Sequence, residues 1–168
     1  MNREEKIGGM LEEKIRDMLV NVTLYQLGLY PEDKLNEELN EFLRGAEGLL
    51  CLTLRRNGAI CFRDYLREYP RFKAERLCLS DAWNWERTGT KGAKLIANLI
   101  RLSIEIHNPE LKSIKDKILL FDKIIHAEHY AGAFKDEFTP EQISIFGVNI
   151  PKVKQEADRI IEEILKRK

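Results

Sequence analysis

Three side chains that can bind a divalent metal lie on one side of a predicted helix: Asp122, His126 and His129. Their spacing of four and then three residues brings them to the same helix face. One carboxylate oxygen and two imidazole nitrogens suit zinc, iron or nickel. The spacing matches neither the H-E-x-x-H motif nor the E-x-x-H motif of di-iron bundles. Two hypotheses therefore stand: a metal-dependent, hydrolase-like site at the edge of the core, and histidines that stabilise the carboxyl end of the helix.

A glycine-flanked lysine opens another predicted helix, in the sequence Thr88-Gly89-Thr90-Lys91-Gly92. Free backbone N–H groups, the helix dipole and the lysine charge favour an anion at such a place, with Thr90, Lys91 and Gly92 as its ligands. The segment is not a phosphate loop of the G-x-x-x-x-G-K-[ST] type. A tight turn in which Thr90 caps the helix explains the same residues, and we favour the turn.

The third candidate is the basic segment 55–87, in which arginines are interleaved with aromatic residues. Arginine pairs with phosphate, and aromatic rings stack on bases, so the segment could contact nucleic acid. Residues 51–101 carry 11 basic and 5 acidic side chains, whereas residues 1–50 carry 6 basic and 11 acidic. The formal charge of the whole chain is zero, which disfavours a nucleic-acid partner. The alternative is a helical surface whose aromatic residues are core and whose arginines pair with Glu38, Glu41 and Glu47.

The cysteines Cys51, Cys61 and Cys78 are widely spaced, odd in number and without a C-x-x-C pair. This pattern is typical of reduced, buried thiols. No histidine adjoins them in the sequence, and no G-x-S-x-G motif occurs, so nothing indicates nucleophilic catalysis. The N-terminus has no secretory signal, and no apolar run reaches the roughly 20 residues of a membrane span. We expect a cytoplasmic protein without a membrane segment.

Helices must position all of these candidates, because apolar residues recur at helical spacing and strand signals are weak throughout. The pattern predicts long helices over about 3–27, 31–57, 92–106, 109–130 and 151–168, a shorter one over 60–68, and another after the capping box Thr139-Pro140-Glu141-Gln142. Residues 71–79 fit either a helix or a connector. Ser80 is a candidate N-cap for a turn that carries Trp83 and Trp85.

The predicted fold is all-α: one domain over residues 1–168, with six to eight helices in orthogonal or up-and-down packing. Hydrophobic residues make up 43% of the chain and charged residues 33%, as in a folded globular protein. The helix over 92–106 is apolar most of the way round and should be the most buried. We expect four side chains to be almost fully buried: Leu99, Ile100, Ile118 and Phe121.

Protein interaction is the function that these features favour, and self-association into a homo-oligomer is its simplest form. Several long amphipathic helices can each carry a dimer face. The first alternative is a metal-dependent, hydrolase-like enzyme that uses Asp122, His126 and His129. The second is a helical protein associated with nucleic acid through segment 55–87.

The metal hypothesis predicts that zinc, nickel, manganese or iron raises the melting temperature, because a ligand that binds only the native state stabilises it. Both imidazoles must be neutral to bind, so the effect should weaken below about pH 6.5. His126→Ala should abolish the shift and leave the fold intact. A thermal-shift series on both proteins measures this; a wild type that carries no metal and responds to none would remove the hypothesis.

Overall fold

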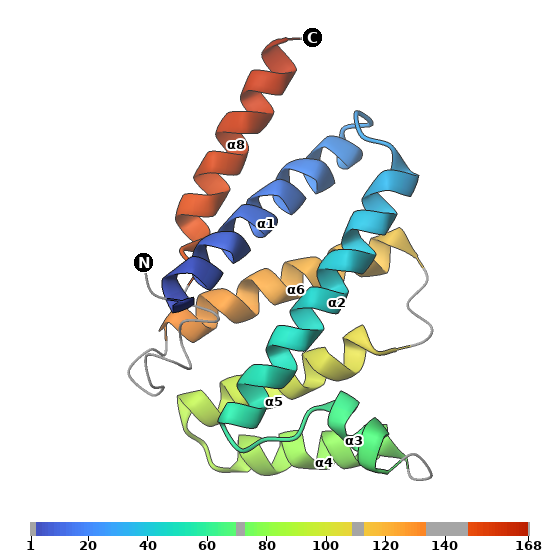
Figure 1. Cartoon of the computed structure of the whole chain (residues 1–168), viewed down its shortest axis with the longest axis vertical. Helices are drawn as coiled ribbons and strands as arrows, with labels where there is room; N and C mark the ends of the chain where they lie inside the picture. Colours follow the sequence, from blue (N-terminus) through green and yellow to red (C-terminus); the bar gives the residue numbers. More distant parts are fainter. Residues whose placement is uncertain (1–2, 70–72, 109–112, 134–147, 168) are drawn as a thin grey trace.

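The computed structural model describes residues 3–69, 73–108, 113–133 and 148–167; for residues 3–10, 74–75 and 128–133 it describes the backbone alone. These residues form seven α-helices and no β-strand (Figure 1). The predicted all-α class is confirmed. The helices are α1 (Arg3–Gln26), α2 (Glu32–Arg56), α3 (Phe62–Glu68), α4 (Ala74–Arg87), α5 (Lys91–Ile106), α6 (Ile114–Ala133) and α8 (Ile150–Lys166).

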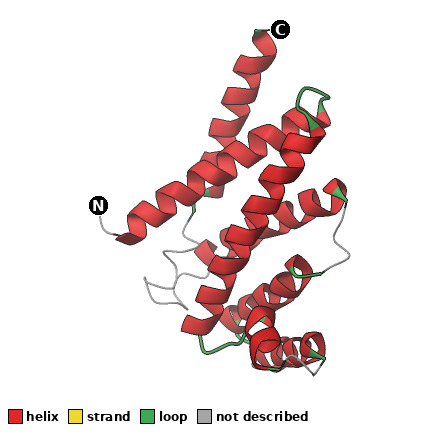
Figure 2. Cartoon of the chain, turned by 45° about the vertical axis from the view of Figure 1, so that its right-hand side comes forward, coloured by secondary structure: helices red, strands yellow, loops and turns green. Residues whose placement is uncertain are grey.

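The helix ends follow from local sequence. Gly28 and Gly58 take positive φ values of 75° and 76° just after α1 and α2, a conformation that glycine adopts without steric cost. The side chain of Asn149 accepts a hydrogen bond from the N–H of Lys152, 3.1 Å away, and so caps α8. Short connections and helix make up nearly all of the described chain (Figure 2).

Helix α2 runs between the two ends of the molecule (Figure 1). Helices α1 and α8 pack side by side at one end, while α3 and α4 pack against α5 at the other. Helices α5 and α6 both lie against α2 and against each other. None of the described helices is both long enough and apolar enough to cross a membrane.

The core is one continuous cluster of buried side chains from α1, α2, α4, α5, α6 and α8. As predicted, α5 is its central helix, since ten of its sixteen residues are buried. Phe42 of α2 meets Phe121 of α6 edge to face, with ring centroids 5.2 Å apart. A smaller cluster joins α1 to α8. The division of the chain into a single domain stays a prediction.

Apolar spacing predicts a buried stripe of Leu111, Ile114, Ile118, Phe121 and Ile125 on the helix over 109–130, and the buried face observed for α6 is rotated from it. Leu111 lies outside the described residues. Leu99, Ile100 and Phe121 are buried as expected, but Ile118 is only partly buried, so that prediction was wrong. Besides Phe121 and Ile125 of the predicted stripe, the buried face of α6 includes Leu120 and Ile124. It also takes in the stem of Lys117, which is 7% exposed, because a long lysine side chain can cover apolar surface.

Two predicted helix starts also differ from the structure. Ser80 lies inside α4, where its hydroxyl donates to the carbonyl of Arg76 at 3.0 Å, so it is not an N-cap. Helix α6 begins at Ile114 rather than directly after Asn108, and the hydroxyl of Ser113 accepts from the N–H of Asp116 at 3.1 Å. The capping box at 139–142 lies outside the described residues.

Leu99→Ala should lower the free energy of unfolding by about 2–5 kcal/mol, because Leu99 is 1% exposed and its truncation leaves a cavity. The control is Leu119→Ala on α6, where the side chain is 53% exposed and the expected change is within about 0.5 kcal/mol. Urea unfolding measures both. Equal losses in the two variants would contradict the central place of α5.

Candidate functional site

Two of the predicted metal ligands, Asp122 and His126, lie on the exposed face of α6. The side chains of Asp122 and His126 are 64% and 57% exposed, with Oδ2 and Nε2 3.6 Å apart. This face lies roughly opposite Leu120 and Ile124, since a helix turns by about 100° per residue. For Asp122 and His126, the expected position at the edge of the core was therefore wrong.

The side chain of His129 lies outside the described residues. Among the side chains that are described, no group of three or more His, Cys, Asp or Glu residues is arranged to hold a metal ion. Metal binding by Asp122, His126 and His129 stays a prediction.

The segment before α5 forms the capped turn that we favoured. Thr90 accepts a hydrogen bond from the N–H of Ala93 at 3.1 Å, and Gly89 takes a positive φ of 77°. The Thr90 oxygen thus satisfies one of the donors that an anion would use. Anion binding by Thr90, Lys91 and Gly92 stays a prediction.

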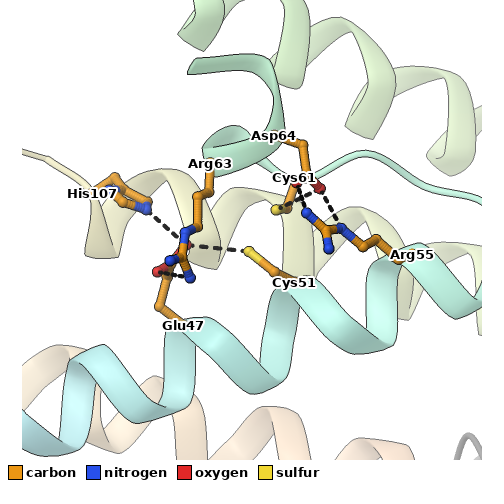
Figure 3. Close-up of polar contacts among 7 residues, drawn as sticks. All are labelled: Glu47, Cys51, Arg55, Cys61, Arg63, Asp64 and His107. Carbon is orange, nitrogen blue, oxygen red and sulfur yellow. Dashed lines mark hydrogen bonds and ion pairs between the residues drawn. The ribbon is translucent and has the colours of Figure 1, made fainter. Parts of the chain in front are cut away.

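A buried carboxylate that no sequence motif marked organises the end of the molecule that contains α3 and α5. Glu47 on α2 is 6% exposed. Its Oε1 lies 2.7 Å from Nε2 of His107 and accepts from the Cys51 thiol at 3.2 Å. Its Oε2 lies 3.7 Å from Nη1 of Arg63 (Figure 3). One carboxylate thereby joins α2, α3 and the end of α5.

A second ion pair fixes α3 beside it. Asp64 accepts two parallel hydrogen bonds from the guanidinium of Arg55, one of them from Nε at 3.1 Å. It also accepts from the Cys61 thiol at 3.2 Å. The hydrogen bonds from Arg55 hold the pKa of Asp64 below its ordinary value despite partial burial. Such a bidentate pair fixes both distance and orientation.

The thiols of Cys51 and Cys61 point toward one another and link these two halves (Figure 3). Their mutual interaction, burial and the Glu47 carboxylate raise the pKa of Cys51. Burial likewise raises the pKa of Cys78. All three cysteines are buried and free, as predicted. Cys51 thus serves as a hydrogen-bond donor rather than as a nucleophile.

A signal for Glu47 was present in the sequence. It lies one turn from both Leu43 and Cys51, so a carboxylate interrupts the apolar stripe of α2. The predicted pairing of an arginine with Glu47 is confirmed by Arg63. Glu38 instead accepts hydrogen bonds from Tyr30 and Asn21.

Exposed apolar side chains gather in the part of the chain that this network positions. Of the ten large exposed hydrophobic residues in the described part, seven lie between Leu52 and Trp83. On α4, Leu79 and Trp83 are 44% and 56% exposed. Arg76 and Arg87 lie on the same side of the helix, and the Arg87 guanidinium stacks 4.5 Å from the Trp83 ring centroid. We call Arg76, Leu79, Trp83 and Arg87 the α4 stripe.

The aromatic residues of segment 55–87 divide between surface and core. Trp83 and Tyr69 are exposed, whereas Phe62, Tyr65 and Trp85 are partly buried against the core. The expectation that these aromatic residues form the core was therefore wrong for Trp83 and Tyr69. Residues 70–72, in the connection between α3 and α4, lie outside the described residues.

No protein-family model matches the chain, and neither a curated protein nor a solved structure is significantly similar to it. A function can therefore be argued only from the chemistry of the described surface.

Glu47 should make the stability of the protein depend on acidity. Burial raises the pKa of Glu47, but hydrogen bonds from His107 and Cys51 and the charge of Arg63 outweigh burial and lower it. A carboxyl group with a lowered pKa stabilises the fold above its unfolded pKa and loses that contribution as the pH falls through the folded pKa. Below about pH 4.5, the free energy of unfolding of the wild type should therefore fall. It should fall less in Glu47→Gln, because this variant lacks the contribution of the ionised carboxylate at every pH.

Urea unfolding over a pH series measures this difference. The control is Glu41→Gln, since Glu41 is exposed on the same helix and the variant should follow the wild type. A Glu47→Gln protein that loses as much stability in acid as the wild type would contradict the role of Glu47.

Proposed function

We propose that the protein acts through protein interaction, and that the α4 stripe binds a second copy of this chain. The observation that carries the proposal is the exposure of Trp83 and Leu79 on one side of α4, between two arginines. Tryptophan and arginine are the residues most often found at the energetic centre of protein interfaces.

An acidic stripe on α2 supplies the complementary surface. Asp33, Glu37 and Glu41 are spaced one turn apart and exposed, and none of them pairs with a cation among the described residues. At about 1.5 Å per residue, this stripe extends over about 12 Å and the α4 stripe over about 16 Å. The lengths of the two surfaces are thus similar, and their charges are opposite.

The two stripes lie toward opposite ends of the molecule. Helix α2 begins at the α1–α2 turn, whereas α4 lies at the far end (Figure 1). The acidic stripe of one copy can therefore meet the α4 stripe of the next without blocking its own. This is a head-to-tail contact, which closes into a ring or continues as a filament. A symmetric contact between two α4 stripes would instead bring arginines together.

Wild type should associate with rising concentration in sedimentation velocity, and salt should weaken the association because the stripes are exposed charges. Trp83→Ala should weaken it at every salt concentration, since the interface loses its apolar centre. Leu119→Ala, an exposed change outside both stripes, is the control. A wild type that stays monomeric up to about 100 μM would contradict the proposal, given typical weak interface affinities.

A charge exchange tests the direction of the contact. One variant carries Arg76→Glu and Arg87→Glu, and the other carries Asp33→Lys, Glu37→Lys and Glu41→Lys. Each variant alone should be monomeric, because its two stripes have the same sign, whereas the mixture should associate. If the triple-lysine variant alone associates as the wild type does, the contact does not use the acidic stripe.

The other two hypotheses have less support. In segment 55–87, Arg55 is bound to Asp64 and Arg63 to Glu47, so fewer arginines remain for phosphate. The metal-dependent enzyme depends on an exposed pair on α6. If the monomer instead binds an oligonucleotide, and if both salt and Trp83→Ala weaken that binding, the nucleic-acid hypothesis would be favoured.

A further inference from the structure

A pocket of about 300 Å³ lies between α2, the end of α5 and the start of α6. Its polar lining is cationic or amide in character and contains no carboxylate of the described residues. The residues that line it are Asn40, Leu43, Arg44, Ile106, Asn108 and Lys117. No sequence motif marked this place, and none of its lining residues belongs to the α4 stripe.

The buried ammonium of Lys117 is the main observation that points to a ligand in this pocket. The residue is 7% exposed, and its Nζ donates to Oδ1 of Asn36 at 2.6 Å. That amide is neutral, and no carboxylate among the described side chains lies within ion-pair distance of the ammonium. An ammonium has three donors, and a buried charge without a counter-charge is costly. An anion in the pocket would supply both the charge and the acceptors.

Arg44 provides a second cation at the rim of the same pocket. Its Nε donates to the backbone carbonyl of Asn40 at 3.4 Å, and the guanidinium is exposed. Asn36, Asn40 and Arg44 are spaced one turn apart, so α2 presents two amides and a guanidinium along one side. A guanidinium binds a carboxylate or phosphate through two parallel hydrogen bonds.

Two carboxylates on the helices that form the pocket already have partners. Glu47 is bound by His107 and Arg63, and Glu105 is bound by Lys123 at 2.8 Å. Neither is available to neutralise Lys117. Leu43 and Ile106 add an apolar wall, and the volume is at the lower end of the range for small-molecule sites.

We infer that this pocket binds a small organic anion, a carboxylate or a phosphate monoester, between Lys117 and Arg44. Lys117 supplies the buried charge, Arg44 holds the outer oxygens, and Asn40 and Asn108 orient the group. The wall of Leu43 and Ile106 favours an organic anion over a bare inorganic ion.

Thermal shifts with glycerol phosphate, succinate and inorganic phosphate, each against sodium chloride of the same ionic strength, test the inference. At least one organic anion should raise the melting temperature more than chloride does. Whichever of glycerol phosphate and succinate gives the larger shift identifies the headgroup. If all three match chloride up to about 50 mM, a concentration at which even millimolar affinity would register, the inference is wrong.

Lys117→Met should abolish the anion-dependent shift. Without ligand, the same variant should melt higher than the wild type, because an apolar side chain of similar length replaces an unpaired buried charge. Lys115→Met is the matched control, since Lys115 is exposed two residues away; it should keep the shift. Arg44→Gln should lower the affinity for the anion roughly tenfold, the loss expected for one charge-assisted contact.

Equal shifts in Lys117→Met and in the wild type would overturn the site. Loss of the shift in Lys115→Met would show a diffuse surface effect and would overturn it as well. Because both variants leave the α4 stripe unchanged, self-association is not affected by these outcomes.

Discussion

The burial of the Glu47 carboxylate is the constraint on which one half of the structure depends. An ionised carboxylate in the core is costly unless donors surround it. Its donors come from three places in the sequence: Cys51 on the same helix, Arg63 on α3 and His107 after α5. Helix α3 is only seven residues long, and these polar contacts add to the packing of Phe62 and Tyr65 against the core. The position of α4, which packs on α3 and α5, follows from this arrangement.

Lys117 is also a buried charged side chain, but its surroundings differ from those of Glu47. Both side chains place a charge among apolar neighbours. Glu47 is bound by several donors of the same chain, whereas Lys117 contacts the neutral amide of Asn36 and no carboxylate among the described residues. A fold can tolerate an incompletely compensated cation when a ligand supplies the missing charge. This difference between the two buried charges distinguishes the structural network around Glu47 from the pocket that we propose as an anion site.

Charge is also separated along the length of the molecule. The exposed carboxylates of α2 lie toward the α1–α2 turn, and α4 carries Arg76 and Arg87, which pair with no carboxylate among the described residues. Within one copy these two surfaces do not meet, so they do not neutralise each other although the chain as a whole has no net charge. The exposed Trp83 lies within the basic surface, which gives a partner both an apolar and an electrostatic contact.

The sequence by itself determined the helices, because their signals are local: Gly28 and Gly58 end helices, Thr90 and Asn149 cap them, and apolar spacing marks α5 as the central helix. It also contained the interruption of the α2 stripe by Glu47. The rotation of α6 could not be read from its own residues. Tertiary packing buried Lys117, left Ile118 partly exposed and turned Asp122 and His126 outward, since the apolar residues of α6 permit more than one buried face. Only the tertiary structure decided which charges find partners, because those partners lie as far apart in sequence as Glu47 and His107.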